Sequence, residues 1–366
     1  MRSSAVTVVL ALLASGSAFA QSAHERFLAW NARYREAPVG VERERLLPEG
    51  VALAKARRKA LSGLIQTDPR TALTWLTRRE QVPAEVAGEL ELPLEASGTF
   101  EVLAAYDARH RTTAVERWLR VGEQRLRVTA YGELTRLRTQ KLHATGLSLD
   151  GWAALLDTGV PHSNVQASAY TTGLKKLLYM RVDFTDAPGD PVNATQANLA
   201  VQSLGQYYKD SSYDRTSITG TVTPTLRMPK SKAAYAQAND TSRLLQDARA
   251  AASQAGFDTS QYQLDVVAFS YVSAWGWSGL GFVGQKGAWV NGAFDADTMA
   301  HEIGHNYGLS HANFWQASGD TITGAGSSLE YGDPFEIMGS GSGQHNAWYK
   351  SSLDWFVGSE VTTATS

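Results

Sequence analysis

The sequence predicts a mixed fold of the α/β or α+β class. In the second half of the chain, apolar runs of strand length alternate with segments that have helical spacing. The first half begins with helical spacing and continues with alternating, strand-like segments. A small, polar segment at 158–173 separates the two halves. Such alternation is typical of helices packed in layers on a sheet.

The composition is that of an ordinary globular protein with room for more than one domain. The chain has 366 residues, of which 43% are hydrophobic and 19% are charged. Its net charge of −2 gives no reason to expect a nucleic-acid partner or an anionic membrane surface. It contains no cysteine, which excludes disulfides, thiol catalysis and cysteine ligands to zinc.

Residues 1–20 have the three-part pattern of a secretory signal peptide. Arg2 gives a basic start, residues 5–14 are apolar, and Ala18 and Ala20 are the small residues before the expected cleavage at Gln21. The apolar run is too short to span a bilayer, so we expect no membrane anchor. We therefore expect a secreted protein, extracellular or periplasmic.

The first half reads as helices followed by strands. Residues 41–66 carry apolar side chains at helical spacing, and Asp68-Pro69 is a typical helix start. Strand-like alternation follows at 98–107, 116–132 and 135–149.

The two halves carry opposite net charge. Residues 21–160 have 21 Lys and Arg against 18 Asp and Glu, whereas residues 161–366 have 12 against 18. Opposite signs favour docking of a pro-segment on an enzyme domain. The predicted division is a signal peptide at 1–20, a propeptide-like domain at 21–165 and a catalytic domain at 166–366, with maturation within 158–173.

The second half alternates strands and helices up to the segment that carries the chemistry. Strands are predicted at 175–184, 217–228 and 262–272, helices at 194–210 and 240–256, and a glycine-broken ribbon at 281–292.

The segment "HEIGHNYGLSH", residues 301–311, has the spacing of a catalytic metal site. His301 and His305 lie four residues apart and share one face of a helix, so both imidazoles can reach one zinc ion. Glu302 lies beside them, within reach of a water on the metal. Gly308 allows the sharp end to the helix that returns His311 to the same ion. Three protein ligands leave one position open, as a catalytic site requires.

The same residues resemble a known signature. HExxHxxGxxH followed by a methionine turn is the pattern of metzincin zinc peptidases, and "EYGDPFEIMGSG" supplies Met338, 27 residues after His311. Together with "HNAWYKSSLDWF" and "SSYDRTSITGTV", these motifs resemble the gametolysin-like family over about residues 170–366. The resemblance implies a metzincin-like catalytic domain with a twisted mixed sheet, an active-site helix and a Met-turn.

The resemblance also implies residue roles and an activity. His301, His305 and His311 would bind one catalytic Zn²⁺, Glu302 would be the general base, and Met338 would pack beneath the site. The implied function is a secreted zinc-dependent endopeptidase that is made as a proenzyme and hydrolyses peptide bonds of protein or peptide substrates with a metal-activated water.

Two positions depart from related patterns. Some metzincins have a further tyrosine ligand two residues after the Met-turn methionine, where this chain has Ser340; Tyr349 lies nearby without an assigned role. Some relatives are kept latent by a cysteine, which this chain lacks. Latency here would need a carboxylate, a histidine such as His110 or His162, or simple occlusion.

Two other hypotheses stay open. In a thermolysin-like site, the third ligand would be a downstream glutamate such as Glu330, although His311 stands at the expected place. Alternatively, the chain is a secreted zinc-containing binding or adhesion protein without proteolytic activity, although a purely structural site has no use for Glu302.

Two further features of the sequence are weaker signals. Asp183, Asp186 and Asp190 lie on one turn and make Ca²⁺ a second candidate cofactor, without the EF-hand spacing. Residues 273–282, rich in aromatics and glycine, fit either a cleft wall with an edge for an extended peptide or core packing.

Overall fold

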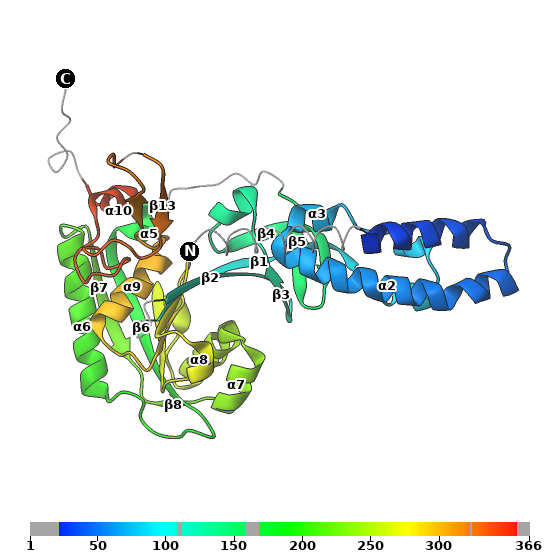
Figure 1. The fold of residues 1–366 in the computed structure, drawn as a ribbon. Coiled ribbons are helices and arrows are strands. Elements are labelled where there is room, and N and C mark those ends of the chain that lie inside the picture. The colour runs from blue at the N-terminus through cyan, green and yellow to red at the C-terminus, as the bar shows by residue number, and fades with distance from the viewer. Residues whose placement is uncertain (1–21, 108–111, 158–167, 323, 357–366) are drawn as a thin grey trace. The chain divides into compact units, whose positions relative to one another are not determined.

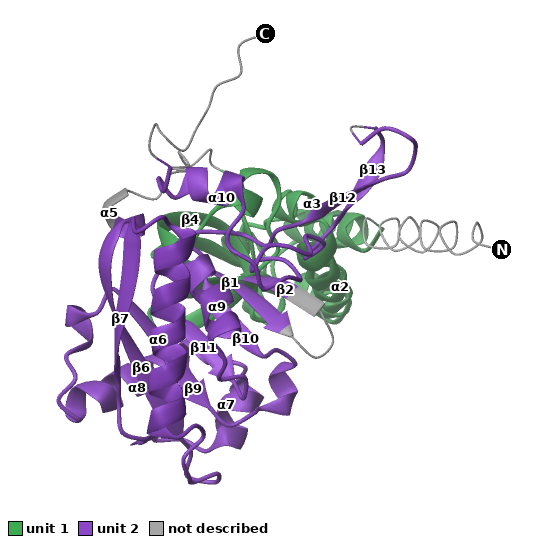
Figure 2. Cartoon of the chain, turned by 90° about the vertical axis from the view of Figure 1, so that its left-hand side faces the viewer, with its two compact units in different colours: residues 1–101, 117–162 green, residues 102–116, 163–366 purple. Residues whose placement is uncertain are grey.

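The computed structural model describes residues 22–107, 112–157, 168–322 and 324–356. The chain divides into two compact units (Figure 2), of which unit 1 comprises 1–101 and 117–162, and unit 2 comprises 102–116 and 163–366. Several predicted features lie outside the described residues: the signal peptide and its cleavage site, the predicted domain boundary at 165, the larger part of the maturation region, His110 and His162. The division into pro-segment and catalytic domain stays a prediction.

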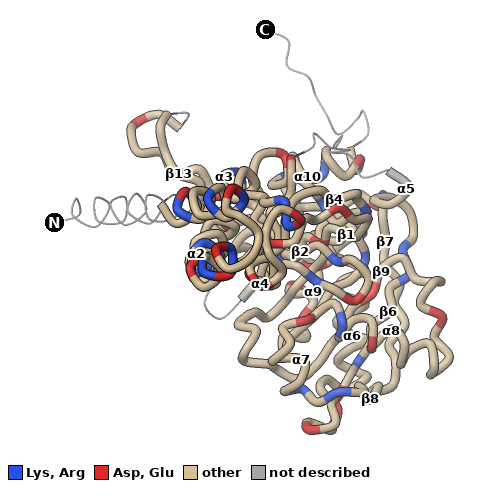
Figure 3. The backbone as a smooth tube through the Cα atoms, turned by 90° about the vertical axis from the view of Figure 1, so that its right-hand side faces the viewer, with Lys and Arg blue, Asp and Glu red and all other residues tan. Residues whose placement is uncertain are grey.

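Unit 1 begins with helices. Residues 22–36 are helical, and they are followed by α2 Val41–Thr67, α3 Pro69–Leu73, η1 Arg79–Gln81 and α4 Ala84–Ala87. The long predicted helix is thus present as α2, which carries both basic and acidic side chains (Figure 3). Its Arg57 is fully buried and is paired with Glu91 at 2.6 Å, so this charge is compensated inside the unit.

The rest of unit 1 is a sheet. Its elements are the part of β1 Leu92–Asp107 up to residue 101, the part of β2 Thr112–Val121 from residue 117, β3 Gln124–Val128, η2 Gly132–Arg136, β4 Gln140–Leu149 and β5 Trp152–Leu155. The strand order is β2-β3-β5-β4-β1, with residues 92–100 of β1 antiparallel to β4. Apolar side chains of α2, α3, β4 and β5 form a core that includes Leu61, Ile65 and Leu147.

Unit 2 has a mixed sheet. Its strands are β6 Gly173–Asp183, β7 Thr216–Val222, β8 Leu226–Arg227, β9 Leu264–Phe269, β10 Gly279–Phe282 and β11 Ala288–Asn291. The order is β10-β11-β9-β6-β7, in which β11, β9, β6 and β7 are parallel and β10 is antiparallel to β11. Residues 103–106 of β1, which belong to unit 2, pair antiparallel with β10. Thus β10 has β11 on one side and this short segment on the other.

Helices cover both faces of this sheet (Figure 1). They are α5 Ser168–Thr171, α6 Ala194–Ser211, α7 Lys232–Ala238, α8 Thr241–Gln254, α9 Ala296–Asn306 and α10 Ala347–Ser352, with the short turns η3 Thr259–Gln261 and η4 Ser273–Trp275 and the hairpin β12 Phe314–Ala317 and β13 Gly326–Leu329. α6 and α9 share one buried core with β6, β9 and β11. α8 lies on the other face, where the indole of Trp289 donates to Thr241 O at 3.0 Å.

The mixed α/β class predicted from the sequence is therefore confirmed, and the metzincin-like form of the domain with its Met-turn stays a prediction. The predicted helices at 194–210 and 240–256 correspond to α6 and α8. The predicted strand at 217–228 is divided into β7 and β8. Within the described part of the chain, no helix has both the length and the apolar character needed to cross a bilayer.

Candidate metal centre

Helix α9 carries the first three predicted site residues. It begins after Asp295, whose carboxylate accepts from the backbone N–H of Thr298 at 2.8 Å and caps the helix. His301, Glu302 and His305 are all buried in the middle of unit 2. A buried helix with three ionisable side chains needs a partner for them, because burying unpaired polar groups is costly.

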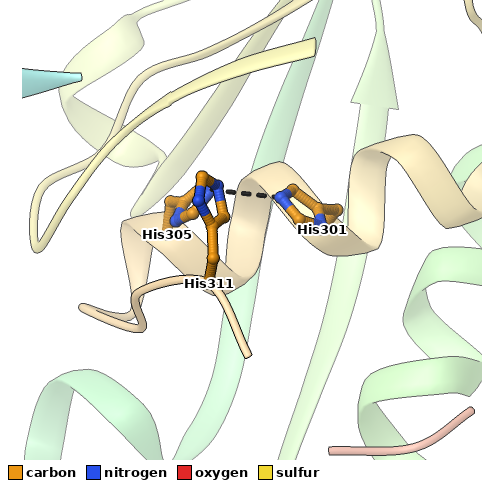
Figure 4. A group of neighbouring side chains, drawn as sticks. All are labelled: His301, His305 and His311. Carbon is orange, nitrogen blue, oxygen red and sulfur yellow. Dashed lines mark hydrogen bonds between the residues drawn. The ribbon is translucent and has the colours of Figure 1, made fainter. Parts of the chain in front are cut away.

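A sharp turn after α9 returns His311 to the two other histidines. Gly308 has a φ of +97°, in the left-handed region that favours glycine, and its N–H donates to His305 O at 2.8 Å. The ring of His311 thereby meets the rings of His301 and His305 (Figure 4). Nε2 of His305 lies 3.1 Å from Nε2 of His301 and 3.1 Å from Nε2 of His311. The turn predicted for Gly308 is present.

Each imidazole is fixed by a hydrogen bond from its other nitrogen. Nδ1 of His301 donates to Ile337 O at 2.7 Å, and Nδ1 of His305 donates to Leu309 O at 2.8 Å. Nδ1 of His311 lies 2.7 Å from Oε1 of Glu330. Carbonyl and carboxylate oxygens only accept, so the protons sit on Nδ1 and all three Nε2 lone pairs face one another.

This arrangement fits a metal ion. Burial lowers the pKa of His301 to about 3 and the pKa of His305 well below its usual value, which keeps both rings neutral. Three neutral acceptors at this separation have no hydrogen to share, whereas nitrogens around a tetrahedral zinc ion stand roughly 3.3 Å apart for Zn–N bonds of about 2.0 Å. Glu330 contacts the far nitrogen of His311, which is the position of an orienting partner and differs from that of the ligand in the thermolysin-like hypothesis.

Glu302 is buried next to this cluster without a protein partner. Its side chain is fully inaccessible, and neither carboxylate oxygen has a hydrogen-bond partner among the described residues. Burial raises its pKa well above the usual value. A Cβ atom on Gly279 would lie 2.1 Å from Oε1 of Glu302, and one on Gly281 would lie 2.8 Å from Glu302 O. Strand β10 thus lies directly against this carboxylate because it has glycine at both positions.

Met338 packs beneath the histidine helix. It is fully buried, and a Cβ atom on Gly304 would lie 2.3 Å from its sulfur, so Gly304 is what allows this approach. The carbonyl of Met338 accepts from Ala312 N at 2.8 Å, directly after His311. The contact is consistent with the packing role predicted for Met338.

A buried hydrogen-bonded pair, Glu336 and His345, holds the Met338 segment. This pair was not predicted from the sequence. Oε1 of Glu336 lies 2.7 Å from Nδ1 of His345 and accepts from Met338 N at 3.2 Å. Its other oxygen accepts from Asn346 N. Glu336 and His345 are 1% and 2% exposed, so this pair is part of the interior. The histidine at position 345 within the quoted C-terminal motif was the available signal.

Tyr331 is a second residue that was missed. Its hydroxyl lies 2.6 Å from Nε2 of His301, and its ring stacks on that imidazole with centroids 5.2 Å apart. Tyr106, from the 103–106 strand, stacks on Tyr331 at 5.0 Å and on His301 at 5.2 Å. Tyr331 lies within the quoted "EYGDPFEIM" motif, but nothing in its spacing pointed to the histidines.

The two positions singled out as departures have other contacts. The hydroxyl of Ser340 donates to Asp333 O at 3.4 Å, and the hydroxyl of Tyr349 donates to the carbonyls of Ser310 and His311 at 2.8 and 3.0 Å. Tyr349 therefore supports the turn that bears His311. Ser340 lines a cavity of about 410 Å³ beside His301, together with residues at the start of α9.

The two weaker sequence signals have different outcomes. In 273–282, Trp275 and Trp277 stack on each other at 5.2 Å and are nearly buried against Phe269, which is core packing. Gly279 and Gly281 of the same segment line the site. Asp183 and Asp190 are paired with Arg227 and Arg181, and Asp186 accepts from Lys232 N. Calcium binding at these carboxylates stays a prediction.

Comparison with protein families gives a match over the second half of the chain. Residues 192–363 match the model of the gametolysin peptidase M11 family, a region that contains α6 to α10 and all the histidines above. No curated protein matches the chain. The family match supports a gametolysin-like metallopeptidase, and so a hydrolase of peptide bonds.

Proposed function

Because residues 192–363 are gametolysin-like, we propose that this chain is a secreted, zinc-dependent endopeptidase made as a proenzyme. The observation that carries the proposal is the convergence of three Nε2 atoms whose Nδ1 atoms are all engaged elsewhere. His301, His305 and His311 would hold the ion, and the predicted signal peptide would direct the protein out of the cytoplasm. Protein or peptide chains would be its substrates.

His301, His305 and His311 would hold the zinc ion, which would supply Lewis-acid chemistry for the scissile carbonyl and the attacking water. The chain's own groups hold the ligands in place. The carbonyls of Ile337 and Leu309 and the carboxylate of Glu330 accept from the imidazoles, which fixes the ring orientations. Met338 packs against Gly304, and this contact would hold helix α9, which bears the ligands, in position.

Glu302 would be the general base. Its carboxylate takes a proton from the attacking water and passes it to the leaving amine. Burial raises the pKa of Glu302 well above the usual value for a glutamate, which strengthens it as a base. Among the described residues, its carboxylate has no hydrogen-bond partner that would compete for that proton.

Residues 21–165 would act as the pro-segment, by occlusion. Residues 103–106 pair with β10, and Leu280 of that strand stands opposite Ala105. A peptide substrate could add to β10 in the same way, since an open sheet edge accepts an extended chain. Tyr106 stacks on His301. This segment would therefore have to leave before a substrate reaches Glu302.

The test is casein hydrolysis by purified protein of known zinc content, beside the Glu302→Gln variant. We expect the variant to keep zinc and to lose about 10²–10⁴-fold in kcat. N-terminal sequencing should find a new terminus within 158–173 in the wild type only. Equal activity of the two proteins would contradict the role of Glu302.

The alternative is a secreted zinc-containing binding or adhesion protein. It predicts one zinc ion per chain with no hydrolysis of any protein substrate, even after the first half has been removed by limited proteolysis. The buried, unpartnered carboxylate of Glu302 favours the enzyme, because a structural zinc site gains nothing from it.

A further inference from the structure

The hydroxyl of Tyr331 contacts one of the three imidazole nitrogens that face one another. Its oxygen is 2.6 Å from Nε2 of His301, the nitrogen that faces His305. Because Nδ1 of His301 already donates to Ile337 O, this Nε2 is an acceptor and the phenol donates to it. The phenol thus uses the lone pair that a metal ion would take.

This hydroxyl has no other partner in the described part of the chain, and Tyr331 is 5% exposed. When an ion takes the lone pair of His301, the hydroxyl loses its hydrogen bond. A buried hydroxyl left without a partner is unfavourable. The ion bound to the adjacent nitrogen can accept a lone pair of the phenolic oxygen, which lies 2.6 Å from that nitrogen.

The ring is held so that this oxygen cannot easily turn away. It stacks on His301 with an angle of 11° between the ring planes and on Tyr106 with 13°. It also contacts the ring of His311, tilted by 43°, with centroids 4.1 Å apart. The backbone of Tyr331 is also fixed in the left-handed region, with φ +65°, where its N–H donates to Oδ1 of Asn313 at 3.2 Å. A residue other than glycine accepts this conformation only where its surroundings demand it.

We propose that Tyr331 is a fourth protein ligand in the full-length chain, which releases its phenolic proton to solvent and binds the metal ion of the three histidines through the resulting phenolate oxygen. The proposal rests on the metal centre proposed above and adds a residue that the motif spacing does not contain. It places the tyrosine before Met338, whereas the position two residues after that methionine is Ser340, whose hydroxyl donates to a backbone carbonyl.

The test replaces the metal by Cu²⁺ in the full-length protein, which then reports a tyrosine oxygen ligand by a charge-transfer band in the visible spectrum. We expect the band in the wild type and its loss in Tyr331→Phe, which keeps the ring and removes only the oxygen. Tyr349→Phe is the matched control, because its hydroxyl lies close to His311 but bonds only backbone carbonyls. Tyr106→Phe is a second control for the neighbouring ring.

Zinc affinity gives an independent measurement. Competition with a chromophoric chelator should show that Tyr331→Phe binds zinc about 10–100-fold more weakly than the wild type, whereas Tyr349→Phe changes it less. If Tyr331→Phe does not fold, loss of the band in either control variant overturns the proposal. Survival of the band in both supports Tyr331, whose hydroxyl contacts Nε2 of His301.

Two outcomes overturn the proposal, and they can be told apart. Copper bound in a one-to-one ratio without a charge-transfer band, or with a band that persists in Tyr331→Phe, rejects Tyr331 as a ligand and leaves the three-histidine site intact. Failure of the wild type to bind zinc or copper at all rejects the metal centre, and the tyrosine ligand with it.

Discussion

The side chain of Glu302 occupies the space that a Cβ atom on Gly279 would need, because that atom would lie 2.1 Å from Oε1 and 2.7 Å from Cδ of the glutamate. Gly279 is the first residue of β10, so the sheet and the active-site helix meet at this point. The position of the proposed base is therefore set by a strand as well as by its own helix.

Gly279→Ala should displace the carboxylate without unfolding the chain. The added methyl group meets only the flexible end of Glu302, which can move, and no backbone atom is among its three nearest neighbours. A displacement of about 1 Å at a reacting group lowers the rate on the order of 10²-fold. We expect kcat for a peptide substrate to fall by that factor, while the zinc content stays at one ion per chain.

Gly319→Ala is the matched control, because a Cβ atom there meets nothing within 4 Å. Its kcat should equal that of the wild type. If Gly279→Ala also kept full activity, either Glu302 would not transfer the proton, or proton transfer would not depend on the exact position of its carboxylate.

Glu302→Gln should stabilise the metal-free protein at neutral pH. Burial raises the pKa of Glu302 in the folded state above the usual 4.5, so folding favours the protonated form. That contribution is complete below the unfolded-state pKa and is lost as the pH rises toward the folded-state pKa, at about 1.4 kcal/mol for each pH unit that separates the two pKa values. With chelator present, the wild type should lose stability as the pH rises from 4.5 toward the raised folded-state pKa of Glu302, and Glu302→Gln should lose much less.

Thermal unfolding at several pH values measures this difference. Glu85→Gln, at an exposed position, should follow the wild type. Parallel curves for the wild type and Glu302→Gln would show that the buried carboxylate has found a partner in the metal-free protein.

The part of the site that could be predicted from the sequence is the part that depends on local spacing. His301, Glu302 and His305 share a helix, and the left-handed conformation at Gly308 follows from the need to return His311 within one turn. Each of these requirements acts over a few residues, so the eleven-residue motif contains them all. Strand β6 and helix α6 were equally predictable, since both have clear apolar periodicity.

The rest depends on segments far apart in the sequence. Tyr331 contacts His301, which lies 30 residues earlier in the sequence. The direction of its hydroxyl depends on the left-handed backbone conformation at Tyr331, which the pattern of apolar residues does not predict. Gly279 is one of many glycines until β10 is placed against α9. In the sequence, nothing distinguishes Glu336 from the other charged residues. Its burial and its hydrogen bond with His345 are visible only in the structure. These contacts become visible only when the units of the chain are folded.

His345→Leu should destabilise the fold and weaken the metal site together. It leaves the buried carboxylate of Glu336 without its histidine partner, and the loss of a partner by a buried polar group costs about 1–3 kcal/mol, with more for a charged group. Because Glu336 also accepts from Met338 N, the segment beneath the ligand helix should loosen. Urea unfolding and zinc titration measure the two effects.

The comparison variant is Lys209→Met, which breaks an exposed ion pair with Asp214 at 3.5 Å. It should change the free energy of unfolding by less than about 1 kcal/mol. A similar small effect of His345→Leu would mean that Glu336 is held well enough by the two backbone N–H groups alone.

Removal of the metal should abolish activity and lower the melting temperature. At a free zinc concentration of 100 times Kd, binding to the folded state adds about 2.7 kcal/mol, which for a domain of this size is roughly 5–10 °C in Tm. Excess chelator should remove both, and added zinc should restore both. If Tm neither falls when chelator is added nor rises when zinc is added, the three histidines hold no ion in solution.

Tyr106→Ala should raise the activity of the unprocessed chain. Tyr106 contributes the ring that stacks on both His301 and Tyr331, and it stands opposite Gly279 in the register of the strand pair. Without that ring the 103–106 strand keeps its backbone pairing but no longer covers the imidazole, so a short peptide should reach the site more often. Initial rates on a small fluorogenic peptide, with the intact N-terminus verified by mass spectrometry, should exceed those of the wild type.

Ala104→Ser, which changes the same strand without removing an aromatic ring, is the control. If neither variant differs from the wild type before processing, while the processed enzyme is active, the strand does not cause latency and another part of residues 21–165 must block the site.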